Sequence, residues 1–280
     1  MSPPNPLDYW RLLVSDDASL PLFEAALSIA QDDYPGLDLA EQQRQVDEFA
    51  GRLRSRLPAD AAVTHRLLSL NHLFFDELGF QGDNENYFHP DNSYLNRVIE
   101  RRRGLPITLA LLYIEIGRQA GIPVQGVSFP GHFLVKARLG EGETFIDVFN
   151  GGGSLSYEEL EQRLESALEP GVPMGDLLAR YLEAATSREI LARTLHNLKG
   201  LFWQKQDWAR LLNVQQRLVV LLPEEPAERR DRGVAWAQLE CPRPAMEDFE
   251  AYLAAVPDAE DGDVLREHLI AMRGAAGRLN

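Results

Sequence analysis

Residues 129–149 read FPGHFLVKARLGEGETFIDVF, a pattern that predicts two β-strands joined by a glycine-rich turn. The first predicted strand carries His132 directly after a Pro-Gly pair, and the second carries Asp147 in an otherwise apolar run. A histidine and a carboxylate on neighbouring strands form the orienting half of a nucleophilic triad. The hairpin therefore raises the question of which nucleophile, if any, these two residues activate.

The segments on either side of this hairpin predict a mixed domain of helices and strands. A helix is expected over residues 106–120, beginning at Pro106 and ending at Gly121. The strand region then comprises PVQGVSF, HFLVKAR and TFIDVFN, and GGGS at 151–154 closes it. Ser156 and Glu159 form a capping box that predicts a returning helix.

Residues 1–78 predict helices, and residues 79–92 predict a long loop. Ser19 is expected to cap the first amphipathic helix, and Asp38 with Glu41 predicts the start of a second. The loop, GFQGDNENYFHPDN, is rich in Gly, Asn and Asp, and loops of this length are often functional. After it, Asn92 or Ser93 is expected to cap a short helix that ends at Gly104.

The residues from 187 onward predict helices with an internal repeat. Pro223 and Pro257 lie 34 residues apart, which is the length of a tetratricopeptide unit. The positions that such a unit fills with a small residue, an aromatic, an alanine and a phenylalanine are here Gly233, Trp236, Ala245 and Phe249. The helix from about Asp263 is expected to cap this array.

Composition excludes several functional classes. The 45% hydrophobic and 25% charged content is typical of a folded domain, and the net charge of -15 argues against nucleic-acid binding. The chain shows no secretory signal and no membrane-spanning run, so we expect a cytoplasmic protein that does not bind membranes. The single cysteine, Cys241, is interpreted as a buried apolar residue. Because the sequence has no second cysteine, an intrachain disulfide is excluded.

The segment GLPITLALLYIEIGRQAGIPV, with the His132 and Asp147 strands, resembles the papain-related transglutaminase-like core. In that family a cysteine begins the helix, and a histidine and an aspartate sit on adjacent strands. Gly104, Ala110 and Gly121-Ile122-Pro123 match the frame around the cysteine, but Pro106 occupies its position. The wider segment from His89 to Val135 is similar to the bacterial invasion-regulator family of transglutaminase-like proteins, which also carry a tetratricopeptide-type tail.

This resemblance implies a site, but one without its nucleophile. His132 and Asp147 correspond to the triad remnant, and Pro106 has a complete structural role at the first position of a helix. Ser93 and Thr108 are the hydroxyls nearest in sequence. A groove between the helix from Pro106 and the His132 strand is expected to be lined by Asn92, Ser93, Tyr94, Thr108, Pro130 and Gly131.

The fold expected is α+β, with a transglutaminase-like domain over residues 1–183 and an all-α tetratricopeptide-like domain over residues 184–280. The leading hypothesis is a non-catalytic protein that binds or regulates a protein or peptide partner, with no cofactor and no metal. One alternative is a hydrolase or acyl transferase with an unusual nucleophile such as Ser93. Another is a scaffold that acts through its helical tail. The sequence specifies neither the partner nor the oligomeric state.

Overall fold

The computed structural model describes residues 5–140, 142–168 and 176–276. Contacts divide the chain into two compact units. The central unit is Asp17–Thr194, and the terminal unit joins the described residues up to Asp16 to those from Leu195 onward. The sequence does not indicate that the N-terminal helix groups with the C-terminal ones. The domain boundary expected between residues 183 and 184 stays a prediction.

Helices make up most of the central unit. The α-helices are α2 (Leu22–Ser28), α3 (Leu39–Arg56), α4 (Val63–Asn71), α5 (Leu95–Arg101), α6 (Pro106–Gln119), α7 (Tyr157–Ala167), α8 (Leu177–Tyr181) and the start of α9 (Ser187–Gln204). Short 3₁₀ segments occur at η1 (Asp17–Ser19), η2 (Ile29–Asp32) and η4 (Pro90–Asn92), and α4 continues as a π-helical segment, η3 (His72–Glu77). Helix α6 begins at Pro106 as predicted.

The predicted hairpin lies in the middle of an antiparallel sheet. Its strands are β3 (Val124–Val127), β4 (Leu134–Leu139), β5 (Gly142–Asp147) and β6 (Gly153–Leu155), and they pair in that order. Val135 lies opposite Ile146, and Lys136 lies opposite Phe145. The last two residues of GGGS at 151–154 belong to β6, where they pair with β5.

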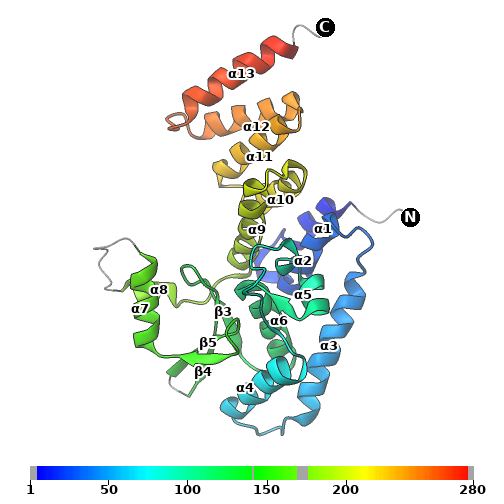
Figure 1. The fold of residues 1–280 in the computed structure, drawn as a ribbon, viewed down its shortest axis with the longest axis vertical. Coiled ribbons are helices and arrows are strands. Elements are labelled where there is room, and N and C mark those ends of the chain that lie inside the picture. The colour runs from blue at the N-terminus through cyan, green and yellow to red at the C-terminus, as the bar shows by residue number, and fades with distance from the viewer. Residues whose placement is uncertain (1–4, 141, 169–175, 277–280) are drawn as a thin grey trace. The chain divides into compact units, whose positions relative to one another are not determined.

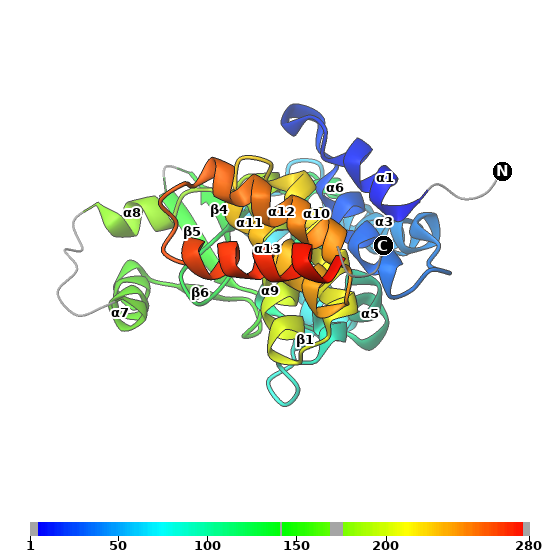
Figure 2. The ribbon, with the colours of Figure 1, turned by 90° about the horizontal axis from the view of Figure 1, so that it is seen from above.

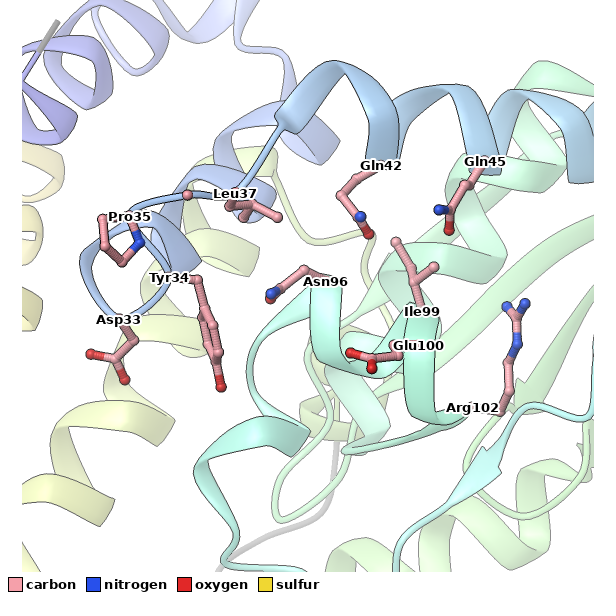
Figure 3. A pocket seen from close by; sticks show the side chains of 11 residues that line it. Asp33, Tyr34, Pro35, Leu37, Gln42, Gln45, Asn96, Ile99, Glu100 and Arg102 are labelled. Carbon is pink, nitrogen blue, oxygen red and sulfur yellow. The ribbon is translucent and has the colours of Figure 1, made fainter. Parts of the chain in front are cut away.

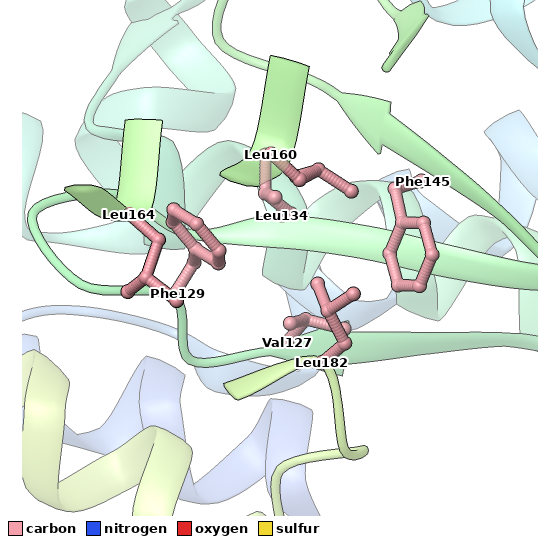
Figure 4. Close-up of a cluster of buried hydrophobic side chains, with 7 residues drawn as sticks. All are labelled: Val127, Phe129, Leu134, Phe145, Leu160, Leu164 and Leu182. Carbon is pink, nitrogen blue, oxygen red and sulfur yellow. The ribbon is translucent and has the colours of Figure 1, made fainter. Parts of the chain in front are cut away.

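Helices cover both faces of this sheet. On one face, α6 packs against β3 and β4, and Gly117 of α6 lies so close to Val124 that a Cβ there would be 2.8 Å from its side chain. On the other face, side chains of the sheet meet those of α7 and the segment after α8 (Figure 4). That cluster consists of Val127, Phe129, Leu134, Phe145, Leu160, Leu164 and Leu182. The sheet thus lies between α6 and α7 (Figure 1).

Two predicted helix caps are wrong. Helix α2 has Pro21 at its N-cap, and Ser19 belongs to the preceding 3₁₀ turn. Helix α5 has Tyr94 at its N-cap, because Asn92 ends the 3₁₀ turn before it and Ser93 is the C-cap of that turn. By contrast, Asp38 caps α3 as predicted, with its side chain accepting a hydrogen bond from the backbone of Glu41.

The end of α5 also differs from the prediction. The helix ends at Arg101, and Arg102 takes a left-handed conformation with φ of 59°. Arg103 and Gly104 then form β2 (Arg103–Gly104), which pairs in parallel with β1 (Gln81–Gly82) of the long loop. This pairing fixes one end of the loop against the residues that lead into α6.

The terminal unit is an array of antiparallel helices. It contains α1 (Pro6–Leu13), the later part of α9, α10 (Trp208–Leu221), α11 (Pro226–Gln238), α12 (Pro242–Ala255) and α13 (Gly262–Ala276), and α10 to α13 stack in chain order (Figures 1 and 2). The predicted repeat positions meet between α11 and α12, where a Cβ on Gly233 would lie 2.6 Å from the ring of Phe249. Ala245 is fully buried beside them.

The single cysteine lies at the start of α12. Cys241 occupies the N-cap and is only half-buried, so the interpretation as a buried apolar residue is wrong. Its thiol points to the carbonyl of Leu239 at 3.5 Å.

Candidate functional site

A tight turn presents His132 to the sheet. The amide of His132 donates a hydrogen bond to the carbonyl of Phe129 at 3.1 Å, and Gly131 has φ of 68°. Proline followed by a residue with positive φ is the pattern of a type II turn, which explains why Pro130-Gly131 occurs here. The prediction that His132 lies on the strand is wrong, because β4 begins at Leu134. The turn instead holds the imidazole just ahead of the strand.

Asp147 ends β5 and collects several donors. Its carboxylate accepts from His132 Nε2 at 2.8 Å, from Asn150 Nδ2 at 2.9 Å and from Arg163 Nη1 at 3.0 Å. Burial raises the pKa of the Asp147 carboxyl, but the hydrogen bonds from His132, Asn150 and Arg163 outweigh it and hold the pKa well below its usual range. Asp147 is therefore ionised, and its two oxygens accept hydrogen bonds from His132, Asn150 and Arg163.

The predicted hydrogen bond between His132 and Asp147 is thus confirmed, and its geometry defines what the histidine can do. A carboxylate only accepts, so Nε2 carries the proton and Nδ1 is left as the second ring nitrogen. The side chain of His132 keeps 18% of its surface exposed. The pair therefore has the arrangement of a base held in one tautomer by a carboxylate.

Contacts link this pair to the start of α6. The ring of His132 packs edge-on against Phe149, with the centroids 6.0 Å apart. The Phe149 ring in turn fills the space over Gly82, where a Cβ would lie 2.6 Å away. Gly82 pairs with Gly104, and Pro106 follows as the first, buried residue of α6. A proline supplies no nucleophile at this position.

The two candidate hydroxyls, those of Ser93 and Thr108, are buried. Thr108 Oγ1 donates to the carbonyl of Asn92 at 2.7 Å and accepts from the amide of Leu105 at 2.9 Å, which closes the first turn of α6. Ser93 is 5% exposed and follows the 3₁₀ turn at Pro90–Asn92. Their side chains have the surroundings of structural residues.

The remaining predicted groove residues separate by burial. Asn92 donates to the carbonyl of Asn86 at 2.8 Å and accepts from Arg101, and the Tyr94 hydroxyl donates to Asp33 at 2.9 Å. Both of them are buried, whereas Pro130 is half-buried and Gly131 is exposed. Only the turn before His132 is thus open to solvent, and the assignment of all six residues to a groove stays a prediction.

Sequence reasoning missed several side chains around the pair. Asn150 and Arg163 complete the donors to Asp147, and Phe149 positions His132. The ring centroid of Tyr87 lies 6.0 Å from that of Phe149. The Tyr87 ring also packs edge-on against the ring of Phe88, which is 71% exposed. Tyr87 and Phe88, two of the three aromatic residues in the predicted functional loop, were the available signal. No local pattern marks Arg163, because it reaches Asp147 from α7.

Two further properties bear on the class of site. Among the described residues, His, Cys, Asp and Glu side chains form no group of three or more that could hold a metal ion. None of the helices that the structure describes combines the length and the hydropathy that crossing a bilayer requires.

Comparison with known proteins places these features in a family. A profile of the transglutaminase-like superfamily matches residues 40–196, and a tetratricopeptide-repeat profile matches residues 198–269. A UPF0162 protein of Xylella fastidiosa strain 9a5c is 40% identical over 265 residues, 94% of each chain. A UPF0162 protein of Pseudomonas aeruginosa is 32% identical over 239 residues, 85% of each chain, and Protein SirB1 of Salmonella typhimurium is 26% identical over 238 residues, 85% of this chain and 86% of that protein. The predicted resemblance and the predicted fold class are confirmed.

Proposed function

Because this chain belongs to the transglutaminase-like superfamily, in the family of the UPF0162 proteins and SirB1, we propose that it is a non-catalytic member that binds or regulates a protein partner. The observation that carries this proposal is Pro106. A transglutaminase-like reaction needs a thiolate at the start of α6, where the helix dipole and an imidazolium lower the thiol pKa. Proline at that position provides neither a nucleophile nor an N–H donor.

The other candidates for a nucleophile do not support catalysis. Thr108 Oγ1 is occupied by two backbone groups, and Ser93 lies in the buried interior. Cys241 belongs to the terminal unit, at the N-cap of α12. None of these three side chains therefore supports a nucleophilic role beside the His132–Asp147 pair.

The surface around the pair has features that favour recognition of another protein. Phe88 and Tyr87 project aromatic surface from the loop, and the ring of Tyr87 packs edge-on against Phe149. Exposed aromatic side chains are enriched where proteins meet, because they bury a large area with little loss of rotamer entropy. The tetratricopeptide repeat of the terminal unit supports the same class of function, since such arrays bind peptides.

An activity comparison tests the proposal against the hydrolase alternative. Wild-type protein, Ser93→Ala and His132→Gln are incubated with a p-nitrophenyl ester and, separately, with casein and a fluorescent primary amine. His89→Gln is the matched control for non-specific imidazole chemistry, since His89 is an exposed histidine of the 79–92 loop. We expect the same background rate in all four proteins. A wild-type rate that Ser93→Ala or His132→Gln abolishes, while His89→Gln retains it, would establish catalysis and refute the proposal.

A further inference from the structure

A cavity of about 650 Å³ opens between the loop at Asp33–Leu37, the first turns of α3 and one side of α5. Figure 3 shows Gln42 on α3 facing Asn96 on α5, and Arg102 also lines the cavity. Gln42 Oε1 and Asn96 Oδ1 have no hydrogen-bond partner within the described part of the chain, but both atoms have almost no accessible surface. A ligand in the cavity does not reach them, so the cavity indicates no particular ligand.

Arg193 of α9, in the central unit, is a half-buried cation without a carboxylate partner. Its Nη1 donates to Ser128 Oγ at 2.9 Å and to the carbonyl of Phe129 at 2.8 Å, and its Cζ lies 5.7 Å from the ring centroid of Phe133. Among the described residues no carboxylate forms an ion pair with it, and burial lowers its pKa. Charges that are withdrawn from water are normally paired. An anion from another molecule would supply the missing partner.

One edge of the Arg193 guanidinium is open. Nη1 uses its two hydrogens on Ser128 and Phe129, whereas Nε and Nη2 have no partner among the described residues. Neither of these two atoms is among the unpaired polar atoms that their surroundings close off from solvent. The hydrogens on Nε and Nη2 point along one edge of the planar group and match the two oxygens of a carboxylate. The open edge therefore fits a bidentate carboxylate.

Arg193 belongs to the same surface as His132 and the aromatic residues of the loop. The amide of His132 and Nη1 of Arg193 donate to the same carbonyl oxygen of Phe129, so the two nitrogens lie no more than 5.9 Å apart, the sum of the distances of 3.1 and 2.8 Å. Arg193 also acts on the Tyr87 hydroxyl, where it opposes the rise in pKa that burial causes. Tyr87 packs against Phe149, and Phe149 packs against His132. These contacts close a ring, so Arg193 is part of the proposed partner surface.

The neighbouring groups favour a carboxylate over a phosphate. Recognition of a phosphate usually takes a cluster of arginines. Here His132 offers an acceptor nitrogen, Nδ1, because Asp147 accepts from Nε2. An acceptor suits the N–H of a peptide backbone and opposes a phosphate. The net charge of the chain is -15, so an acidic partner is attracted only where a cation lacks a carboxylate of its own.

We propose that Arg193 binds a side-chain carboxylate of the protein partner, from a glutamate or an aspartate that stands next to an apolar residue. Nε and Nη2 donate to the carboxylate, and His132 Nδ1 accepts from a backbone N–H of the same segment. Phe88, which is 71% exposed and packs on Tyr87, contacts the apolar residue.

This inference rests on the proposed function, because it names the partner chemistry of the same surface. The two fail separately. Ester hydrolysis that depends on Ser93 or His132 would refute the non-catalytic role and leave the carboxylate contact measurable. Loss of the preference for a carboxylate would refute the contact and leave the activity comparison unaffected.

An NMR titration of the full chain with three blocked tetrapeptides tests the contact. The peptides are acetyl-Ala-Glu-Phe-Ala-amide, acetyl-Ala-Gln-Phe-Ala-amide and acetyl-Ala-phosphoserine-Phe-Ala-amide, and the readout is the ring signals of His132. Arg193→Gln removes the guanidinium, and Phe88→Ala removes the exposed ring. Arg138→Gln is the matched control, because it makes the same charge change at an exposed residue of β4.

We expect saturable shifts with the Glu peptide and at least about tenfold weaker binding of the Gln peptide, because a charge-assisted bidentate pair is lost. Arg193→Gln should abolish this preference, Arg138→Gln should retain it, and Phe88→Ala should weaken the binding of both peptides by the same factor.

Four results would overturn the proposal. They are the absence of saturable shifts up to about 10 mM Glu peptide, equal binding of the Glu and Gln peptides, a preference for Glu that Arg193→Gln retains, and tighter binding of the phosphoserine peptide than of the Glu peptide. Binding that Phe88→Ala leaves unchanged would overturn the placement of the apolar residue. The comparison of the Glu and Gln peptides on the wild-type protein needs no variant, so it stays decisive if Arg193→Gln does not fold.

Discussion

Replacing Pro106 by cysteine tests whether the His132–Asp147 pair is the remnant of a working triad. The new thiol would start α6, and His132 Nδ1 is the ring nitrogen that Asp147 leaves available. The helix dipole and the imidazolium should together lower the thiol pKa from about 8.5 to about 6.5, within the range of activated cysteines. Loss of the proline should cost about 1 kcal/mol, because its contribution is mainly a preorganised backbone.

The pH dependence of alkylation by iodoacetamide measures this pKa, in a Cys241→Ala background that leaves one thiol. At pH 6, a thiol of pKa 6.5 is about 24% ionised, against about 0.3% at pKa 8.5. Because a less basic thiolate is also less nucleophilic, the expected gain in rate is nearer to about tenfold. The midpoint of the profile is the primary readout, since it does not depend on intrinsic nucleophilicity.

Two controls separate the histidine from the helix. Pro242→Cys places a thiol at the first position of α12, which has 14 residues like α6, without the His132–Asp147 pair. His132→Gln in the Pro106→Cys protein removes the imidazole alone. We expect the midpoint of Pro242→Cys to lie between that of a free thiol and that of Pro106→Cys, because only a helix dipole acts on it. We expect His132→Gln to raise the midpoint of Pro106→Cys by at least about one pH unit. A midpoint near 8.5 that His132→Gln leaves unchanged would refute the remnant-triad interpretation.

Two further predictions concern the terminal unit. Burial raises the pKa of Glu228, but hydrogen bonds from His196 and Lys199 outweigh it and lower the pKa to about 2. A depressed carboxyl pKa stabilises the fold above the unfolded value of about 4.3, and this stability is lost as pH falls toward 2. The free energy of unfolding measured in urea should therefore drop over this window by up to about 3 kcal/mol, and it should drop less in Glu228→Gln. Gly233→Ala should lower the free energy of unfolding by about 1–3 kcal/mol, because its Cβ would clash with Phe249, whereas Gly200→Ala, with nothing within 4 Å, should raise it by up to about 1 kcal/mol. Equal effects of the two alanines in urea unfolding would contradict the close packing at Gly233.

The strands and the long helix could be predicted because their signals are local. The apolar runs around His132 and Asp147 have the period of strands, and Pro106 with Gly121 marks the two ends of one helix. The tail could be predicted for a similar reason, since Gly233 and Phe249 keep the spacing of a repeat. Such patterns are written in consecutive or evenly spaced residues, and one sequence is enough to find them.

The errors came from features that depend on distant contacts. The caps at Ser19 and Ser93 looked favourable locally, but Ser19 ends one 3₁₀ turn and Ser93 is the C-cap of another, before the helices begin. The cavity at Asn96 and Arg102 depends on how α3 approaches α5, which are more than thirty residues apart in the chain. The grouping of α1 with the terminal unit depends on Trp10, whose indole donates to the carbonyl of Arg217. None of these juxtapositions has a local sequence pattern.

The hydrogen bond between His132 and Asp147 is compatible with a purely structural role in a site that has no nucleophile. Asp147 joins the turn before β4, the segment after β5 and, through Arg163, helix α7. Removing one donor from a buried carboxylate leaves a charge that the remaining donors must compensate, so folding alone has a reason to keep the pair. Retention of His132 and Asp147 is therefore weak support for catalysis. A cysteine introduced at Pro106 distinguishes the two roles, because a structural pair needs no correct distance to the start of α6, whereas a disarmed triad does.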